Sequence, residues 1–403
     1  MNRLNYFIKK IIFAYKKNVL GEKLSLFISN KIQQYIKVPL VYFFKINTKI
    51  NKLGIDDQSG FKDHRSEVNF KSISDRNILR IIKAYKLAKQ HQNIIAELEI
   101  KGLWSEWISI NFSDLIEALD RENIDQLRQI FDNIMRNPCT VGLGSFDEWN
   151  RSKRLFGKSY IKYVWYDYYT KLSKQNPEYK ITFPLVGNPS GLSLKNIVVP
   201  YESLRHSYRA EEIKNCLFDC GQKIIVEIGG GYGGLAFQLD TILGHTNFHY
   251  SLYDIPEVAA IASSFLLTSL SEDKVKLYGE EPFSLNVNSQ VCIYPHFAIA
   301  QLEEQSVDLI YNSCSFSEMD GQSVKYYLKV IEKACRKYFM HDNHDKKLIF
   351  KEADGLYSEN IIGSDIIPST NSFKLIYKKL RTHGLPEDKS FLHHEFLYKR
   401  KDS

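Results

Sequence analysis

The stretch IIVEIGGGYGGLAFQL, residues 224–239, decides the fold. Its five glycines all lie between Gly229 and Gly234, behind an apolar run that carries a single acid, Glu227. The apolar run predicts a buried strand, and GLAFQLDTILG predicts the helix that follows it. Glycines between a strand and a helix allow a ligand to approach the backbone, and the helix N-terminus offers amide groups to an acidic ligand. We therefore expect a ligand-binding turn here.

The next predicted strand ends in an acid. FHYSLYD, residues 248–254, ends at Asp254. In a doubly wound sheet such an acid lies at the crevice beyond the strand ends and can accept hydrogen bonds from two ribose hydroxyls. Asp254 could alternatively cap the helix that begins in PEVAAIASSFLL. The position favours a ligand that contains a nucleoside.

The order of the predicted elements indicates an α/β fold. Strands and helices alternate over residues 201–403, which predicts a Rossmann-like, doubly wound sheet. Its last two strands, in SFKLIYKKL and SFLHHEFLYKR, are expected to form an antiparallel hairpin. Residues 61–200 are interpreted as a mostly helical and irregular acceptor-side region, and residues 1–60 as a basic amphipathic segment.

The glycine motif also carries a family resemblance. Gly229, Gly231 and Gly234 satisfy the dinucleotide pattern G-x-G-x-x-G, which is weak by itself. E-x-G-x-G-x-G from Glu227 to Gly233, the acid that ends the second strand and the terminal hairpin resemble a class I S-adenosylmethionine-dependent methyltransferase. The strings VEIGGGYGGLA, LYDIPEV, LIYNSCSFSEM and VGNPSG…LRHSYRAEEI resemble the bacterial sugar O-methyltransferases, from about residue 137 to the C-terminus.

The resemblance implies S-adenosyl-L-methionine as the cofactor. Three glycines would line its methionine and ribose, and His296 would lie near its adenine. Glu227 would hold the methionine amino group or, alternatively, brace the glycine turn, and His296 has the alternative role of a loop histidine. The implied cofactor-binding residues are Glu227, Gly229, Gly231, Gly233, Asp254 and His296.

On the acceptor side, NSCSFSEM follows the fourth strand and is expected to face the transferred methyl group. A sugar hydroxyl is a poor nucleophile, so a general base should assist it. Glu318 is the first candidate and His206 the second, although Glu318 could instead brace the next helix and His206 could be a core residue. Tyrosines at residues 160–169 could stack on sugar rings, but such density is more typical of a core. Substrate contacts are expected from Asn312, Ser315 and Tyr208.

The charge of the chain is concentrated at its N-terminus. The 403 residues carry a net charge of +7, whereas residues 1–52 hold eleven Lys or Arg and one acid, a net +10. Apolar residues fall on one face of a helix predicted there: Leu4, Ile8, Ile11 and Tyr15. Such a helix suits an anionic membrane surface, with a packed helix and solvated lysines as the alternative. Nucleic acid is not expected, because no reader motif accompanies the charge.

Six scattered cysteines indicate a reducing compartment, so we expect a cytoplasmic protein, which the basic segment could bring to the inner face of the membrane. HDNHD, residues 341–345, is expected in a loop away from the acceptor face. His393, His394 and Glu395 should alternate across a strand, so no metal site is expected. The expected acceptor is a bacterial surface glycan or its nucleotide-sugar precursor.

Two other classes of function stay open at this point. An NAD-dependent oxidoreductase acting on a nucleotide sugar would need a catalytic Tyr-x-x-x-Lys or a comparable acid, which the helix after NSCSFSEM does not offer convincingly. A non-catalytic, membrane-associated scaffold with a cofactor-binding fold is the second alternative. The intact glycines and Asp254 argue against it.

Overall fold

The computed structural model describes part of the chain. It covers residues 47–401 except 57, 93, 102, 141–156, 245, 286–289, 346, 348, 352–356 and 381–392. The apolar stripe expected from Leu4 to Tyr15 lies outside the described residues. Among the described helices, none is both long enough and apolar enough to cross a membrane.

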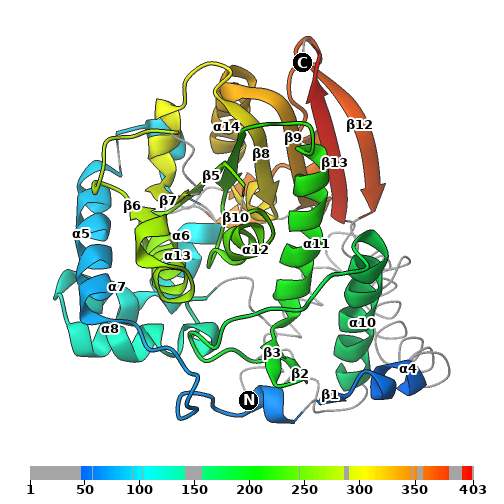
Figure 1. Cartoon of the computed structure of the whole chain (residues 1–403). Coiled ribbons are helices and arrows are strands. Elements are labelled where there is room, and N and C mark those ends of the chain that lie inside the picture. Colours follow the sequence, from blue (N-terminus) through cyan, green and yellow to red (C-terminus); the bar gives the residue numbers. More distant parts are fainter. Residues whose placement is uncertain are drawn as a thin grey trace, which may run out of the picture.

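An eight-stranded sheet forms the centre of the molecule, in the order β12-β13-β9-β8-β4-β5-β7-β6 (Figure 1). The strands are β4 (Lys223–Ile228), β5 (Phe248–Asp254), β6 (Val275–Leu277), β7 (Gln290–Pro295), β8 (Val307–Ser313), β9 (Cys335–His344), β12 (Phe373–Leu380) and β13 (His393–Arg400). β4 pairs in parallel with β5 and β8, whereas β13 runs antiparallel to β9 and β12. The expected terminal hairpin is therefore confirmed.

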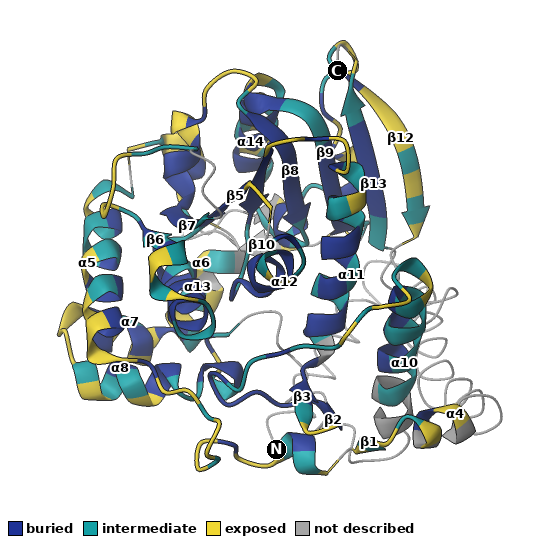
Figure 2. Cartoon of the chain, in the orientation of Figure 1, coloured by how far each residue is buried: buried dark blue, intermediate teal, exposed yellow. Residues whose placement is uncertain are grey.

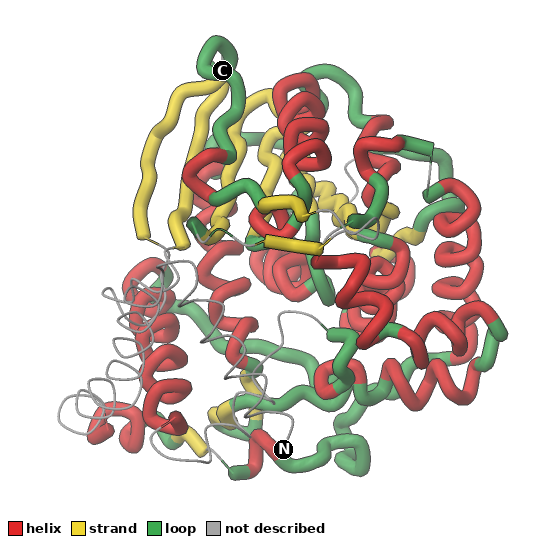
Figure 3. The backbone as a smooth tube through the Cα atoms, turned by 180° about the vertical axis from the view of Figure 1, so that it is seen from behind, coloured by secondary structure: helices red, strands yellow, loops and turns green. Residues whose placement is uncertain are grey.

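Helices cover both faces of this sheet. The α-helices are α4 (Asn47–Lys52), α5 (Asp75–His91), α6 (Leu103–Asn111), α7 (Ser113–Asp120), α8 (Ile124–Phe131), α10 (Gly157–Gln175), α11 (Tyr201–Cys216), α12 (Gly234–Leu243), α13 (Pro256–Ser269) and α14 (Gly321–Ala334). The 3₁₀ turns are η3 (Ser59–Phe61), η4 (Ala96–Leu98), η5 (Ile134–Arg136), η6 (Glu272–Lys274), η7 (His296–Gln301), η8 (Ser315–Glu318) and η9 (Gly363–Asp365). Figure 3 shows the sheet from behind, with helices on this side as well.

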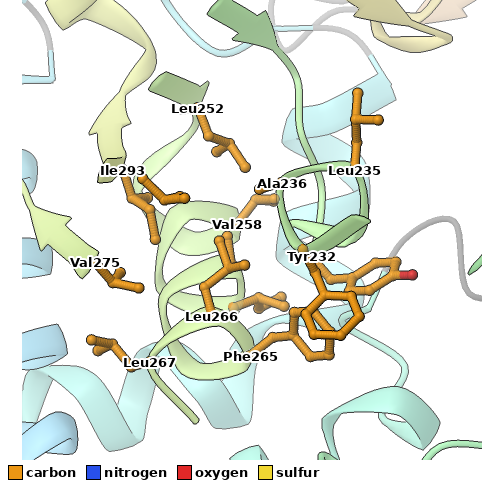
Figure 4. Close-up of a cluster of buried hydrophobic side chains, with 14 of the residues drawn as sticks. Tyr232, Leu235, Ala236, Leu252, Val258, Phe265, Leu266, Leu267, Val275 and Ile293 are labelled. Carbon is orange, nitrogen blue, oxygen red and sulfur yellow. The ribbon is translucent and has the colours of Figure 1, made fainter. Parts of the chain in front are cut away.

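Side chains at alternate positions of the strands belong to two hydrophobic clusters, one on each face of the sheet. Ile225 and Leu252 pack with α5, α12 and α13, while Val226 and Ile310 pack with α14 on the other face. All six residues of β4 are buried, as expected for a central parallel strand covered on both sides. Its neighbour β8 is buried along most of its length as well (Figure 2). Figure 4 shows part of the first cluster, where Leu252 of the sheet lies near α13. The Rossmann-like doubly wound fold is therefore confirmed.

The helical region before residue 200 shares a core with the sheet domain. α5 packs against α13, and Ile78 and Ile81 belong to the same cluster as Leu252. A small three-stranded sheet, β1 (Ile55–Asp56), β2 (Leu192–Leu194) and β3 (Ile197–Val199), lies near α10, whose Trp165 and Tyr168 are buried. These two aromatic residues of the stretch 160–169 are therefore core residues, not a sugar platform.

The run HDNHD is not a loop. Residues 341–344 form the end of β9, paired with β8 on one side and β13 on the other. Their polar side chains suggested a loop, but partners in the fold satisfy them. His341 Nε2, for example, donates to the Ile366 carbonyl at 3.1 Å, and its ring stacks on Phe396. A further hairpin, β10 (Ile349–Lys351) with β11 (Tyr357–Glu359), follows.

Candidate active site

A cavity of about 310 Å³ lies at the carboxyl ends of β4, β5 and β8. β4 has β5 on one side and β8 on the other. The chain adds β5 to β7 on one side of β4 and then crosses over to add β8 on the other, so β4 lies at a topological switch point. Crevices at such a switch point are the usual ligand sites of open α/β sheets. Gly229, Asp254 and Ser313, from the ends of the three strands, all line the cavity.

The glycine turn adopts a backbone that requires glycine. Gly229, Gly231 and Gly233 have φ angles of 73°, 58° and 87°. A Cβ on Gly229 would lie 2.2 Å from Ser315 Oγ, so the turn and η8 are in close contact. Gly229 and Gly231 line the cavity, as expected. Gly233 does not: it is the N-cap of α12 and packs against Leu266.

Asp254 lies at the end of β5 and lines the cavity. Its Oδ2 accepts a hydrogen bond from the Gly231 amide at 2.9 Å, and its Oδ1 accepts one from the Ile255 amide at 2.8 Å. The N-cap of α13 is Ile255, so Asp254 is not the cap of that helix. Burial raises the pKa of Asp254 to about 7 against these two hydrogen bonds, which lower it.

Glu227 lies beneath the turn, inside β4, and also lines the cavity. The Tyr250 hydroxyl donates to its Oε2, and a Cβ on Gly230 would lie 2.7 Å from the same oxygen. Burial raises the pKa of Glu227 to about 7, and the neighbouring Asp254 adds to this effect. The position is compatible with both expected roles, bracing the turn and facing a ligand.

His296 begins η7 and is buried at the cavity wall. Its Nε2 lies 2.9 Å from the Leu98 carbonyl oxygen, which can only accept, so Nε2 carries the proton. Its buried Nδ1 has no hydrogen-bond partner among the described residues. Burial lowers the pKa of His296 to about 4, so the ring is neutral and Nδ1 is a free acceptor at neutral pH.

The two candidate bases both line the cavity. Burial raises the pKa of Glu318 to about 7, although Trp104 donates a hydrogen bond to its side chain. Burial, followed by the charge of Arg205, lowers the pKa of His206 well below its usual value. His206 Nδ1 lies 3.2 Å from the Tyr232 hydroxyl. Glu318 therefore titrates near neutral pH, where a general base is most effective, whereas His206 is a neutral partner of the glycine turn.

Two residues expected to contact the substrate, Asn312 and Tyr208, lie outside the cavity lining. Asn312 is fully buried and does not line the cavity. Side chains alternate along a strand, so Tyr311 and Ser313 face the cavity and Asn312 faces away. Tyr208 follows His206 by two positions, which turns it to another side of α11, where it lies near Tyr168 and Lys379. Ser315 does line the cavity.

The sequence did not single out Arg205 and Trp104, which also line the cavity. The Arg205 Nη1 donates to Ser313 Oγ at 3.0 Å, and the guanidinium pairs with Glu202. Arg205 stands beside His206 in LRHSYRAEE, but no spacing marks it as a ligand contact. Trp104 comes from α6, outside the region of family resemblance, so only the fold brings it to Glu318.

One group of described residues could in principle hold a metal ion: Cys314, Asp342 and His393, whose ligating atoms lie within 4.8 Å of one another. Asp342 is already engaged. Its Oδ1 accepts from Ser313 Oγ at 2.9 Å, and its Oδ2 accepts from the Tyr311 hydroxyl and from Arg209. These donors already satisfy the carboxylate, and the Arg209 cation beside it opposes a second positive charge, so the structure gives no reason to assign an ion here.

The buried carboxyl of Glu318 should make stability depend on pH. Its folded pKa of about 7 exceeds its ordinary value of 4.5, so its contribution is complete below about pH 4.5 and is lost as pH rises through 7. We expect Glu318→Gln to raise the free energy of unfolding of the ligand-free protein at pH 8 by about 1–3 kcal/mol, with little change at pH 4.5. Urea unfolding at both pH values measures this. An equal change at the two pH values would contradict the assignment.

Comparisons with known proteins give a fold likeness only. No family model matches the chain, and no curated protein matches its sequence. An S-adenosylmethionine-dependent methyltransferase from Mesorhizobium loti is 11% identical over 48% of this chain and 98% of its own, with a TM-score of 0.30. Magnesium protoporphyrin IX methyltransferase from Synechocystis, with bound S-adenosylhomocysteine, is 12% identical over 59% of this chain and 95% of its own, with a TM-score of 0.33. Similarity at this level carries no argument about the activity of this chain.

Proposed function

We propose that the protein is an S-adenosylmethionine-dependent O-methyltransferase that methylates a sugar hydroxyl of a bacterial surface glycan or its precursor. The observation that carries the proposal is the cavity at the switch point. On one side it has the glycine turn and Asp254, and on the other it has Glu318. A nucleoside ligand and a hydroxyl acceptor can therefore meet in one cavity.

The charges around the cavity support a cationic cofactor. Glu227, Asp254 and Glu318 all line it, and burial raises the pKa of each to about 7. A sulfonium and an ammonium group would relieve the cost of ionising these carboxyls. The guanidinium of Arg205 lies on the same wall and suits the cofactor's carboxylate.

The remaining cavity groups suit the ends of such a cofactor and its acceptor. Asp254 offers carboxylate oxygens to ribose hydroxyls, and the unpartnered Nδ1 of His296 offers an acceptor to the adenine amino group. The cofactor supplies an electrophilic methyl group when bound. Glu318 would take the proton of the attacking hydroxyl, and the cavity would hold that hydroxyl in line with the methyl carbon.

Calorimetric titration separates this proposal from its two rivals. S-adenosylmethionine and S-adenosylhomocysteine should bind, and NAD should not. Binding of NAD alone would favour an oxidoreductase, and binding of neither would favour the scaffold. Transfer of a tritiated methyl group should then be measured to three acceptor sets: simple methyl glycosides, nucleotide sugars and lipid-linked glycans. Label in none of these sugars would refute the proposed acceptor class.

The basic N-terminal segment is proposed as a membrane contact that brings the enzyme to its acceptor. We expect deletion of residues 1–46, which keeps α4 and its buried Ile50, to release the protein from anionic vesicles while leaving cofactor affinity unchanged. Binding of the full chain should weaken as salt rises, because exposed charges are screened beyond about 8–10 Å at physiological ionic strength. Cosedimentation with anionic and neutral vesicles, at low and high salt, measures this. If the full chain stays in the supernatant with both, the segment has another role.

A further inference from the structure

We propose that Asn343 is a positioning residue that couples the glycine turn to the segment carrying Glu318, so that cofactor binding and the placement of this carboxylate depend on each other. The proposal rests on the function proposed above. Asn343 lies near the end of β9, is fully buried and does not line the cavity. Any effect it has on a ligand must therefore pass through other residues.

Asn343 connects two elements with one side-chain amide. Its Nδ2 donates to Asn312 Oδ1 at 2.8 Å, and its Oδ1 accepts from the Ser317 backbone amide at 3.0 Å. Ser317 immediately precedes Glu318. The Ser317 carbonyl also accepts from Asn360 Nδ2 at 2.8 Å, so both backbone groups of Ser317 are held by buried asparagine side chains.

Asn312 carries the connection to the glycine turn. Its Nδ2 donates to the Ile228 carbonyl at 2.9 Å, directly before Gly229, and to Ser315 Oγ at 2.5 Å. Ser315 also approaches Gly229 so closely that no Cβ would fit there. A continuous path of hydrogen bonds therefore runs from Ile228 through Asn312 and Asn343 to Ser317.

The direction of this path is fixed by its ends. The Ile228 carbonyl can only accept and the Ser317 amide can only donate, so each asparagine amide has one possible orientation. Both asparagines are fully buried, away from water that could replace a lost partner. Movement of one end alone would leave a buried polar group without a partner, which costs free energy. The two ends should therefore move together.

Calorimetry with S-adenosylhomocysteine on the full chain tests the coupling. Asn343→Asp keeps the acceptor for Ser317 but loses the donor to Asn312 Oδ1 and to His341 Nδ1, and we expect it to weaken binding about 5- to 50-fold. Asn77→Asp is the matched control, because Asn77 is buried to a similar degree between α5 and α13, outside the cavity lining. It should lower the melting temperature without changing the affinity. Unchanged affinity in Asn343→Asp, or an equal loss in both variants, would overturn the proposal.

A second measurement uses the unmodified protein, so it does not depend on whether a variant at Asn343 folds. In protein labelled isotopically at asparagine, the side-chain amide signal of Asn343 should shift when S-adenosylhomocysteine is added, although this residue does not touch the cavity. The signal of Asn77 should stay in place. An unmoved Asn343 signal in ligand-bound protein refutes the coupling alone, whereas failure of the unmodified chain to bind S-adenosylhomocysteine refutes the proposed function as well.

Discussion

Replacing Glu318 by glutamine is expected to lower turnover by about 10²–10⁴-fold, the usual contribution of a general base, while leaving cofactor affinity nearly unchanged. Glutamine keeps the shape of the side chain and can still accept from Trp104, but it cannot take a proton. Methyl transfer to the acceptor found in the tritium assay measures the first quantity, and calorimetry with S-adenosylhomocysteine measures the second. Equal losses in turnover and in cofactor affinity would indicate that Glu318 has a structural role, and His206 would then be the candidate base.

The pH profile adds an independent check. Turnover of the unmodified enzyme should rise with pH as Glu318 ionises, because the ionised carboxylate must accept a proton. The bound sulfonium should place this rise below the pKa of about 7 that burial gives Glu318 in the ligand-free protein. In Glu318→Gln the residual activity should lose this limb. Asp240→Asn is a suitable control, since Asp240 is a carboxylate on α12 that pairs with Lys274 outside the cavity lining. That variant should retain the turnover and the pH profile.

The sequence predicted the cofactor half of the fold well because its signals are local. A strand that is buried on both faces must be apolar throughout, and a turn with positive φ angles requires glycine, so residues 223–243 leave few alternatives. Asp254 was found for the same reason, since it ends the next apolar strand. The terminal hairpin was predicted from two strand-like stretches joined by a loop, and these form β12 and β13.

The acceptor half depends on contacts that no local pattern reveals. Trp104 is remote from the glycine turn in sequence, and Arg205 lies on the helix before β4 without a motif that marks it. Only the packed fold brings them together with Glu318 and Ser313. HDNHD was interpreted as a loop because polar runs usually face water. In the fold its side chains find partners in β8, β13 and the segment near Ile366.

Asn312 illustrates the same limit at a single residue. NSCSFSEM was correctly located at the end of a sheet strand, although β6 makes β8 the fifth strand along the chain and not the fourth. The face of each side chain, however, depends on the register of that strand. A shift of one residue exchanges the two faces. Asn312 consequently points into the protein, where it supports the glycine turn, while Ser313 takes the position at the cavity.

Asp254 is the residue on which cofactor affinity should depend most strongly. One of its oxygens holds the Gly231 amide and the other holds the Ile255 amide, so the carboxylate is fixed before a ligand arrives. A carboxylate oxygen can accept more than one hydrogen bond, and both oxygens therefore remain able to accept from ribose hydroxyls. Fixed acceptors of this kind bind more tightly than mobile ones, because little side-chain entropy is lost on binding.

We therefore expect Asp254→Ala to weaken binding of S-adenosylhomocysteine by on the order of 10²-fold or more, since hydrogen bonds to a charged group contribute about 1.5–3 kcal/mol each. Asp254→Asn, which keeps one acceptor oxygen, should lose less. Asp240→Ala is the matched control: Asp240 is a carboxylate on α12 that pairs with Lys274 and does not line the cavity. Calorimetry on all three folded variants makes the comparison. Unchanged affinity in Asp254→Ala would refute the ribose assignment, because the remaining groups at the carboxyl end of β5 offer no second pair of acceptors.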